Sequence, residues 1–396
     1  MNTACCIRAL ALIALMAPAC GAVAPTGAKL TPTPTAVASK EPSPVPSNSP
    51  TAVATNHPTP KPTSAPQPVN PCPPVQPAVI PHPNPNLVLV TLRGSGCVVV
   101  RDITDINHAK TISNLGDGVW PQFVSATTLS YVDAKRGLLR TPLTGAPRTP
   151  IAGGARWVGF FAWSPDGKTA AYLSSGATGS QPPMQLHLVS GGKDRIVSTM
   201  PGLPSVFGCE SQACGDGWDF HLAYSPDGRF ISWAQNITNV FRMWTADGRD
   251  VTPKTPFIQK TIWSGSGFYF QDSKGIEVLR SGVISTFLPG VSWIRPKASP
   301  GGGQIVYETR DSAGVARTYV VDTATAKVRG LGAWRAEPAF LTARFIWDQG
   351  ERSCTTNECV SGSAIGTGHT YIYDLLTGTE TESVITNVFD VWPHPV

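Results

Sequence analysis

The sequence contains the tetrapeptide Ser-Pro-Asp-Gly twice, at 164–167 and 225–228, each time between two apolar runs. Proline at the second position of a turn fixes φ, aspartate hydrogen-bonds back to the main chain, and glycine accepts the positive φ that closes a tight hairpin. The pattern therefore predicts a strand–turn–strand unit. A unit of this kind that recurs at a fixed period indicates a repeat architecture, which limits the folds open to the chain.

Six repeats align on the aromatic residue that ends the strand after each turn. These residues lie 41, 61, 37, 37 and 40 positions apart, so the base period is about 40 and one insertion falls in the 61-residue interval. That period suits four short antiparallel strands, which make one blade of a β-propeller. The six aromatic residues are Tyr131, Tyr172, Trp233, Phe270, Tyr307 and Trp347.

A seventh unit opens the folded region but lacks its first strand. Residues 87–90 and 97–102 predict the two middle strands of a blade, and the segment 390–396 (Asp-Val-Trp-Pro-His-Pro-Val) is similar to the innermost strand predicted at 118–124. A strand supplied from the far end of the chain would close the ring and remove an open sheet edge. We therefore expect an all-β propeller of four-stranded antiparallel blades, with the first blade closed by the C-terminal strand. Seven blades fit best, with six or eight as alternatives.

The Ser-Pro-Asp-Gly turn, its apolar strand and a following hairpin that ends in Asp-x-x-x-Gly resemble the TolB-type, WD-repeat-like propeller family of bacterial envelopes. The resemblance covers about 87–396. It implies the propeller fold and a bias toward protein binding, and the family has no shared catalytic residues to transfer. Turn chemistry and packing between blades are sufficient reasons for the repeated residues.

The N-terminal region predicts export. Residues 1–19 hold one charge, Arg8, and an apolar run that ends in small residues, as in a signal peptide. Cys20 follows directly and resembles the lipid-attachment cysteine of bacterial lipoproteins, although Ala17 stands where leucine is usual. Residues 22–86 contain 19 of the 38 prolines, so 20–86 is predicted to be a disordered, extended stalk. A secreted protein without the anchor is the alternative.

The cysteines favour disulfides over metal binding. Seven of the nine remain once residues 1–19 are removed, and paired cysteines in an exported chain usually form disulfides. Zinc is disfavoured because the four-residue spacings lie in polar loops without nearby histidine. No metal and no cofactor are therefore predicted. The predicted pairs are Cys209–Cys214, Cys354–Cys359 and, by elimination, Cys72–Cys97, which leaves Cys20 for the lipid.

The charge distribution and the absence of catalytic motifs exclude several classes of function. The net charge of +5 is spread along the chain without a basic, aromatic-rich cluster, so nucleic-acid binding is not expected. The sequence has no Gly-x-Ser-x-Gly, His-Glu-x-x-His or phosphate-binding loop. His187 and His221 fall on or beside strands, where a packed or surface imidazole is commoner than a ligand. No catalytic residue is predicted. An envelope hydrolase, lyase or dehydrogenase acting on a sugar or peptide at the propeller channel is the alternative.

Two long loops, 201–218 and 349–368, each carry a short cysteine pair and are predicted to share one rim of the ring. Structured loops on a rigid scaffold commonly carry recognition, and short disulfides lower the entropy lost on binding. We expect a monomeric, envelope-anchored binding or scaffolding module for an envelope protein or a cell-wall ligand, with membrane contact through the lipid only. The alternative is that the two loops are tolerated insertions whose disulfides only keep them from fraying. The candidate rim residues are Phe207, Glu210, Trp218, Phe220 and Arg352.

Overall fold

The computed structural model describes the propeller region, and the predicted signal peptide and nearly all of the predicted stalk lie outside it. It contains 27 strands and one short 3₁₀ helix, η1 (Ile106–His108). None of the helical structure in this part of the chain is long and apolar enough to cross a membrane. The described residues are 85–91, 97–116, 119–132, 137–152, 157–175, 183–200, 220–235, 240–255, 258–265, 267–354 and 364–394.

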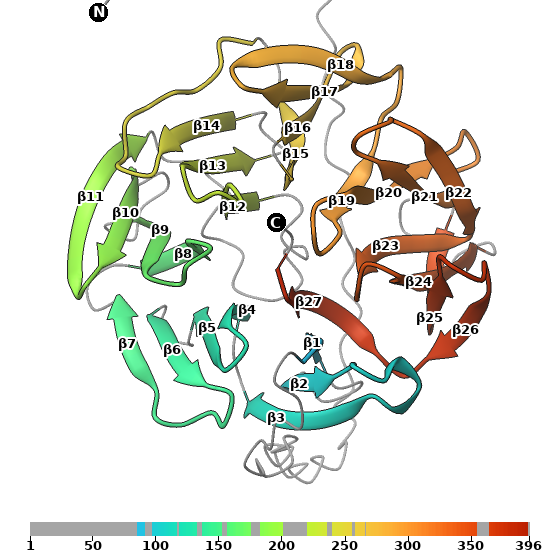
Figure 1. The fold of residues 1–396 in the computed structure, drawn as a ribbon, viewed down its shortest axis with the longest axis horizontal. Coiled ribbons are helices and arrows are strands. Elements are labelled where there is room, and N and C mark those ends of the chain that lie inside the picture. Colours follow the sequence, from blue (N-terminus) through green and yellow to red (C-terminus); the bar gives the residue numbers. More distant parts are fainter. Residues whose placement is uncertain are drawn as a thin grey trace, which may run out of the picture. The chain divides into compact units, whose positions relative to one another are not determined.

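The strands form seven antiparallel sheets that follow one another around a central axis (Figure 1). Each sheet is one blade, and its inner strand is the one nearest the axis. The all-β, seven-bladed prediction is therefore confirmed. Blade 1 consists of β27 (Thr386–Trp392), β1 (Leu87–Thr91), β2 (Val98–Asp102) and β3 (Lys110–Gly116); blade 2 of β4 (Val119–Ser125), β5 (Thr128–Val132), β6 (Leu138–Pro142) and β7 (Thr149–Ala152); and blade 3 of β8 (Trp157–Trp163), β9 (Thr169–Ser175), β10 (Met184–Ser190) and β11 (Lys193–Met200).

Blade 4 has three strands among the described residues, and an isolated bridge between Trp244 and Asp250 adds to its outer edge. The remaining blades each have four. Blade 4 consists of β12 (Phe220–Tyr224), β13 (Phe230–Gln235) and β14 (Val240–Thr245); blade 5 of β15 (Gln259–Ser264), β16 (Gly267–Asp272), β17 (Gly275–Arg280) and β18 (Val283–Pro289); blade 6 of β19 (Ile294–Ala298), β20 (Gln304–Arg310), β21 (Ala316–Asp322) and β22 (Val328–Ala333); and blade 7 of β23 (Arg335–Phe340), β24 (Phe345–Ser353), β25 (Ala364–Asp374) and β26 (Glu380–Ser383).

The Ser-Pro-Asp-Gly segments form the predicted turns. In the first, the Gly167 N–H donates to the Ser164 carbonyl at 2.8 Å, and Asp166 Oδ1 accepts from Ser164 Oγ and from the Lys168 N–H. Gly167 has a φ of 65°, a conformation that costs glycine little. The second copy repeats these contacts. The turn chemistry therefore explains why the motif recurs between the first two strands of blades 3 and 4.

The C-terminal strand closes the ring as predicted. β27 pairs with β1 from Leu87–Trp392 to Thr91–Thr386. Asp390 Oδ2 also accepts the Phe123 N–H at 2.7 Å, which ties β27 to the inner strand of blade 2. The sequence match that suggested this closure is out of register, because Trp120 is the second residue of β4 whereas Trp392 is the last residue of β27. The closure was correct, but the alignment of the two Val-Trp-Pro segments was wrong.

The repeated aromatic residues pack between blades. All six are at most 2% exposed, and burial of side chains this large dominates the energetics of a core. Trp233, for example, belongs to an apolar cluster with Phe160 of blade 3, and their ring centroids lie 5.3 Å apart. The aromatic repeat is therefore a packing device.

The segment 349–368, predicted as a loop, is largely a hairpin. β24 continues to Ser353 and β25 begins at Ala364, with Arg352 paired with Ile365. The two strands have 9 and 11 residues. Pairing of this kind satisfies main-chain groups that a loop would leave to solvent. Blade 7 therefore presents two long paired strands, with one break in register between Gln349 and Glu351, where a structured loop was expected.

Candidate functional site

Five inner strands contain a non-glycine residue in the left-handed conformation. The residue sits in each case at a break in the pairing register between the inner strand and its neighbour, which is a β-bulge. The five strands belong to consecutive blades, from blade 5 through blade 7 to blades 1 and 2 (Figure 1). We call these residues the bulge ring: Lys260 (φ 46°), Arg295 (49°), Glu337 (56°), Asn387 (47°) and Trp120 (51°).

The bulge ring stores backbone strain. A side chain in the left-handed region costs roughly 1–2 kcal/mol per residue, and such residues cluster at functional sites, where bulges redirect side chains. The inner strand of blade 4 pairs with β13 without any break in register. An inner strand can therefore be built without the bulge, although the inner strand of blade 3 also breaks register, between Val158 and Phe161.

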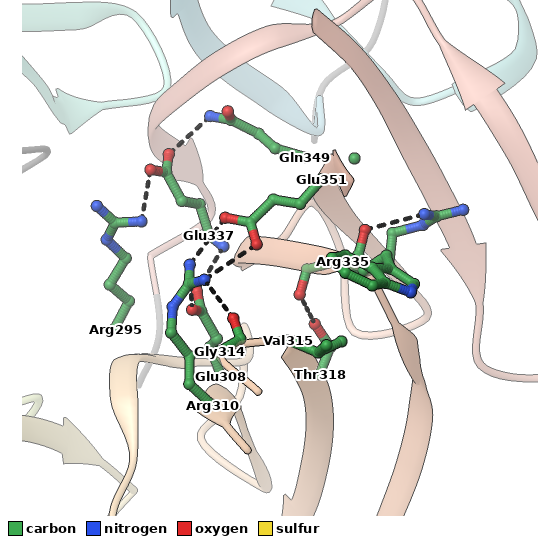
Figure 2. Close-up of polar contacts among 12 residues, drawn as sticks. Arg295, Glu308, Arg310, Gly314, Val315, Thr318, Arg335, Glu337, Gln349 and Glu351 are labelled. Atoms are coloured by element: carbon green, nitrogen blue, oxygen red, sulfur yellow. Dashed lines mark hydrogen bonds and ion pairs between the residues drawn. The ribbon is translucent and has the colours of Figure 1, made fainter. Parts of the chain in front are cut away.

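Hydrogen bonds connect the bulge ring across three blades. Arg295 Nη1 donates to Glu337 Oε1 at 2.5 Å, which joins β19 to β23. Gln349 on β24 donates to Glu337 Oε2 at 2.6 Å and lies 3.5 Å from Asn387 Oδ1 on β27. Figure 2 shows Arg295 and Gln349 approaching the Glu337 carboxylate from opposite sides. Glu337 is thus held by a cation and an amide.

A second group of charged side chains, on blades 6 and 7, contacts the main chain at Glu337. Glu308 on β20 is fully buried, and its Oε2 accepts the Glu337 N–H at 3.1 Å. Arg310 Nη2 lies 2.9 Å from Glu308 Oε1, and both nitrogens of its fork reach Glu351 on β24, at 2.8 and 3.1 Å (Figure 2). Burial raises the pKa of Glu308, and the positive charge of Arg310 opposes this rise. The pair Glu308–Arg310 on blade 6 therefore stabilises the bulge at Glu337 through the hydrogen bond to the Glu337 N–H.

Each carboxylate of this network forms an ion pair with an arginine. Glu337 is bound by Arg295, and Glu308 and Glu351 share Arg310. A general base needs a lone pair that can reach a substrate proton, and these carboxylates direct theirs to guanidinium groups. Across the described ranges, no group of three or more His, Cys, Asp or Glu residues is placed to hold a metal ion.

Basic residues lie on the inner strands of blades 4 to 6. Lys260 Nζ lies 3.5 Å from Ser292 Oγ, and burial lowers the pKa of Lys260. Burial also lowers the pKa of His221 on β12 to about 4, and the positive charge of Lys297 on β19 adds to this effect. His221 is therefore neutral near pH 7, and the lysines carry the charge at this side of the axis.

Blade 3 contains a Ser-His-Asp arrangement that the spacing of these residues does not suggest. His187 Nε2 lies 2.9 Å from Ser174 Oγ, and His187 Nδ1 lies 2.9 Å from Asp194 Oδ1. Tyr172 stacks on the imidazole and donates to Asp194 Oδ2 at 2.6 Å. Ser174 and His187 are both 0% exposed. A buried serine cannot reach a substrate, so this group is a polar contact across β9, β10 and β11. His187 is packed, which is one of the two roles predicted for it.

The predicted rim residues are only partly placed. Phe220 is the first residue of β12, and Arg352 is exposed on β24. The structure therefore places only these two of the five candidates. Cys97 and Cys354 are each disulfide-bonded, while the predicted pairs stay predictions because at least one member of each lies outside the described residues. The candidate residues that lie outside the described part of the chain are Phe207, Glu210, Trp218, Cys20, Cys72, Cys209, Cys214 and Cys359.

The bulge ring was missed by sequence reasoning, although one signal points to it. Three of its members precede a proline, in Trp120-Pro121, Arg295-Pro296 and Glu337-Pro338. Proline disfavours the right-handed helical conformation in the residue before it. A large side chain before proline at the start of a predicted inner strand was therefore the available clue, but it does not separate extended from left-handed backbone.

Comparisons with known proteins found similar solved structures but no matching family. No protein-family model and no curated protein matches the sequence. Among solved structures, TolB from Acinetobacter baumannii is 15% identical with a TM-score of 0.43, covering 78% of this chain and 66% of its own. A manganese complex of oligogalacturonate lyase is 12% identical (TM-score 0.41; 74% and 77% covered). A puromycin-hydrolyzing peptidase from Mycobacterium tuberculosis is 14% identical (TM-score 0.49; 79% and 56%).

The chain thus spans less than two thirds of the TolB and peptidase chains. At identities this low, the similarity concerns the fold and not the activity. A TolB-like protein from Agrobacterium tumefaciens is also among the similar structures, at 16% identity and a TM-score of 0.39 (63% and 89% covered). This chain is a seven-bladed β-propeller whose structural neighbours include TolB proteins as well as a lyase and a peptidase.

Proposed function

We propose that this protein is an exported, lipid-anchored propeller that binds an envelope protein or a cell-wall ligand without catalysing a reaction, and that the ligand contacts the bulge ring. One observation carries the proposal. Five consecutive inner strands hold strained non-glycine residues, four of them polar or charged, while the inner strand of blade 4 forms without a register break. Strain that the fold does not require is expected where it serves a site.

The state of the acidic groups supports binding over catalysis. Glu308, Glu337 and Glu351 each form an ion pair with an arginine, an arrangement that fixes shape and leaves no carboxylate poised to move a proton. The buried Ser174 of the Ser-His-Asp arrangement does not favour the enzymatic alternative, because substrate cannot reach its hydroxyl. A preorganised polar surface at the centre of a rigid ring suits recognition.

The predicted rim and the bulge ring fit one binding face. Ala336, the residue before Glu337, pairs with Gln349, and the β24–β25 hairpin continues from there to Arg352. A ligand seated on the bulge ring can therefore also reach this hairpin. Delivery to the envelope rests on the N-terminal sequence, with Cys20 as the lipid attachment site and 20–86 as the stalk. Cys20→Ser is expected to move the protein from the membrane fraction to the soluble one.

The test is capture by the immobilised full-length protein from detergent-solubilised envelope, followed by titration of each captured molecule. Asn387→Gly removes a bulge-ring side chain and keeps a residue that accepts positive φ, and Arg352→Ala truncates the hairpin. The matched control is Ser281→Gly, because Ser281 is also left-handed (φ 48°) but lies exposed in the β17–β18 turn at the outer edge of blade 5. We expect weaker binding by the first two variants and wild-type binding by the control. Equal binding by all four proteins would refute the proposed site.

A further inference from the structure

The outer edge of blade 5 presents an uncharged strand to solvent. This strand, β18, pairs with β17 and with no other strand that the structure describes. Residues 283–286, at the start of β18, are all exposed and carry no charge. Val283 is 66% exposed and Ile284 is 38% exposed. We call residues 283–286 the open edge.

The other outer strands are protected against pairing with another chain. Unpaired main-chain groups of an edge strand can bind a further strand, and proteins prevent this with charged side chains or proline on the edge. The open edge has neither, because the one proline of β18, Pro289, is its last residue. Each of the other outer strands in the described ranges contains such a residue, for example Lys110 on β3, Pro150 on β7, Arg195 on β11, Arg242 on β14, Arg329 on β22 and Glu382 on β26.

The open edge is held in the extended conformation by contacts on its inner side. β18 pairs with β17 along its length, and Thr286 Oγ1 donates to Glu277 Oε1 on β17 at 2.8 Å. Phe287 and Leu288, which follow the open edge, are buried in the apolar cluster of blade 5. A strand that is already ordered loses little conformational entropy when it pairs, so the open edge is preorganised to receive a partner strand.

We propose that the open edge pairs with the open edge of a second copy of this chain, antiparallel and about a two-fold axis. Such pairing is self-complementary, because both copies supply the same donors and acceptors. The absence of charge suits an identical partner, since a charge on this edge would meet a like charge across the axis. The predicted stalk is a poor occupant, because residues 22–86 contain 19 of the 38 prolines and proline has no N–H to donate.

The position of the open edge is compatible with this dimer. Figure 1 shows β18 at the outside of the ring, across the axis from β1, the strand that the predicted stalk precedes. Two copies joined through β18 therefore keep the starts of their propellers away from the contact. Pairing of one edge is a small contact and gives a weak dimer, and anchoring of both copies to one membrane, as proposed above, raises their effective concentration. A dimer of this kind differs from the monomer predicted from the sequence and leaves the bulge ring free.

Sedimentation equilibrium of the full-length protein in density-matched detergent tests the pairing, and we expect a monomer–dimer equilibrium. Ser285 is exposed in the middle of the open edge, so pairing about a two-fold axis brings it beside its own counterpart. Ser285→Lys and Ser285→Glu should each raise the Kd of the dimer by about tenfold or more, because like charges then meet across the axis. An equimolar mixture of the two variants should pair again, because opposite charges then face each other.

Val328→Lys is the matched control, because Val328 is 41% exposed on β22, the outer strand of blade 6, and this variant should dimerise as the wild type does. Hydrogen exchange in the peptide that covers β18 should slow as the protein concentration rises, whereas exchange in β22 should not change. The inference is overturned if the protein is monomeric at every concentration, if Ser285→Lys dimerises normally, if the mixed variants do not pair, or if assembly continues beyond the dimer.

Discussion

Replacing Arg310 by methionine should destabilise the propeller in a way that depends on pH. Arg310 is shared by Glu308, which is 0% exposed, and Glu351, which is 13% exposed. Methionine retains the apolar part of the side chain but leaves the buried Glu308 carboxylate without its cation. Removing one partner of a buried ion pair typically costs about 3–5 kcal/mol. Because Arg310 itself is 35% exposed, solvent screening reduces this to about 2–3 kcal/mol.

The pH dependence follows from Glu308. Burial already raises its pKa above the ordinary value while Arg310 opposes the rise, so removing Arg310 should raise the pKa further. A carboxyl whose pKa is higher in the folded state loses its contribution to stability as the pH rises through that pKa. The loss caused by Arg310→Met should therefore be large at pH 8 and smaller at pH 5, where protonation removes the uncompensated charge.

Denaturant unfolding at the two pH values measures the effect, and a second substitution isolates its cause. Glu308→Gln keeps an acceptor for the Glu337 N–H and carries no charge, so the double variant Glu308→Gln/Arg310→Met should recover most of the stability at pH 8. Arg317→Met, which breaks an exposed pair with Asp311 at 3.2 Å, should cost less than about 1 kcal/mol. The reasoning is refuted if Arg310→Met costs no more than Arg317→Met, or if the cost is the same at pH 5 and pH 8.

Three further predictions concern the bulge ring, a buried carboxyl and the closing strand. Lys260→Gly and the control Ser281→Gly should each stabilise the fold by about 0.5–1 kcal/mol, since relief of left-handed strain exceeds the extra freedom of the unfolded chain, but only Lys260→Gly should weaken capture of the envelope ligand. Burial raises the pKa of Asp348 to about 8, so the stability that this carboxyl contributes is lost as the pH rises from about 4 to 8. The melting temperature of Asp348→Asn relative to that of the wild type should therefore rise over this range. A difference in melting temperature that stays constant with pH would be inconsistent with this. Deleting 389–396 removes the pairs that β27 makes with Leu87, Val88 and Leu89 and should cause aggregation or loss of cooperative melting; wild-type melting would contradict the split blade.

The sequence was sufficient for the repeat because each repeat carries local chemistry. The Ser-Pro-Asp-Gly turns form with only neighbouring residues, and their hydrogen bonds are those expected of the motif. Ring closure was predictable for a different reason, since a blade that lacks its first strand must obtain one elsewhere. The register of that strand was not predictable, because a Val-Trp-Pro segment reads the same in the sequence whether it lies at the start or at the end of a strand.

The candidate site was largely out of reach of sequence reasoning. Glu308 and Glu337 are brought together by packing between blades, and no short-range pattern encodes a contact between residues 29 positions apart. The left-handed backbone of Arg295 depends on where the pairing register breaks. Ser174, His187 and Asp194 likewise meet only because of the register of three strands. Local propensity specifies turns and strands, whereas tertiary pairing specifies which side chains converge.

Hydrogen exchange of the full-length protein with and without its captured envelope ligand tests the central claim most directly. The account predicts slower deuterium uptake in peptides that cover β15, β19 and the β24–β25 hairpin, because a ligand on the bulge ring orders these strands. Uptake in the outer strands β11 and β18 should not change. Protection confined to the outer strands, with none at Lys260, Arg295 or Glu337, would contradict binding at the centre of the ring.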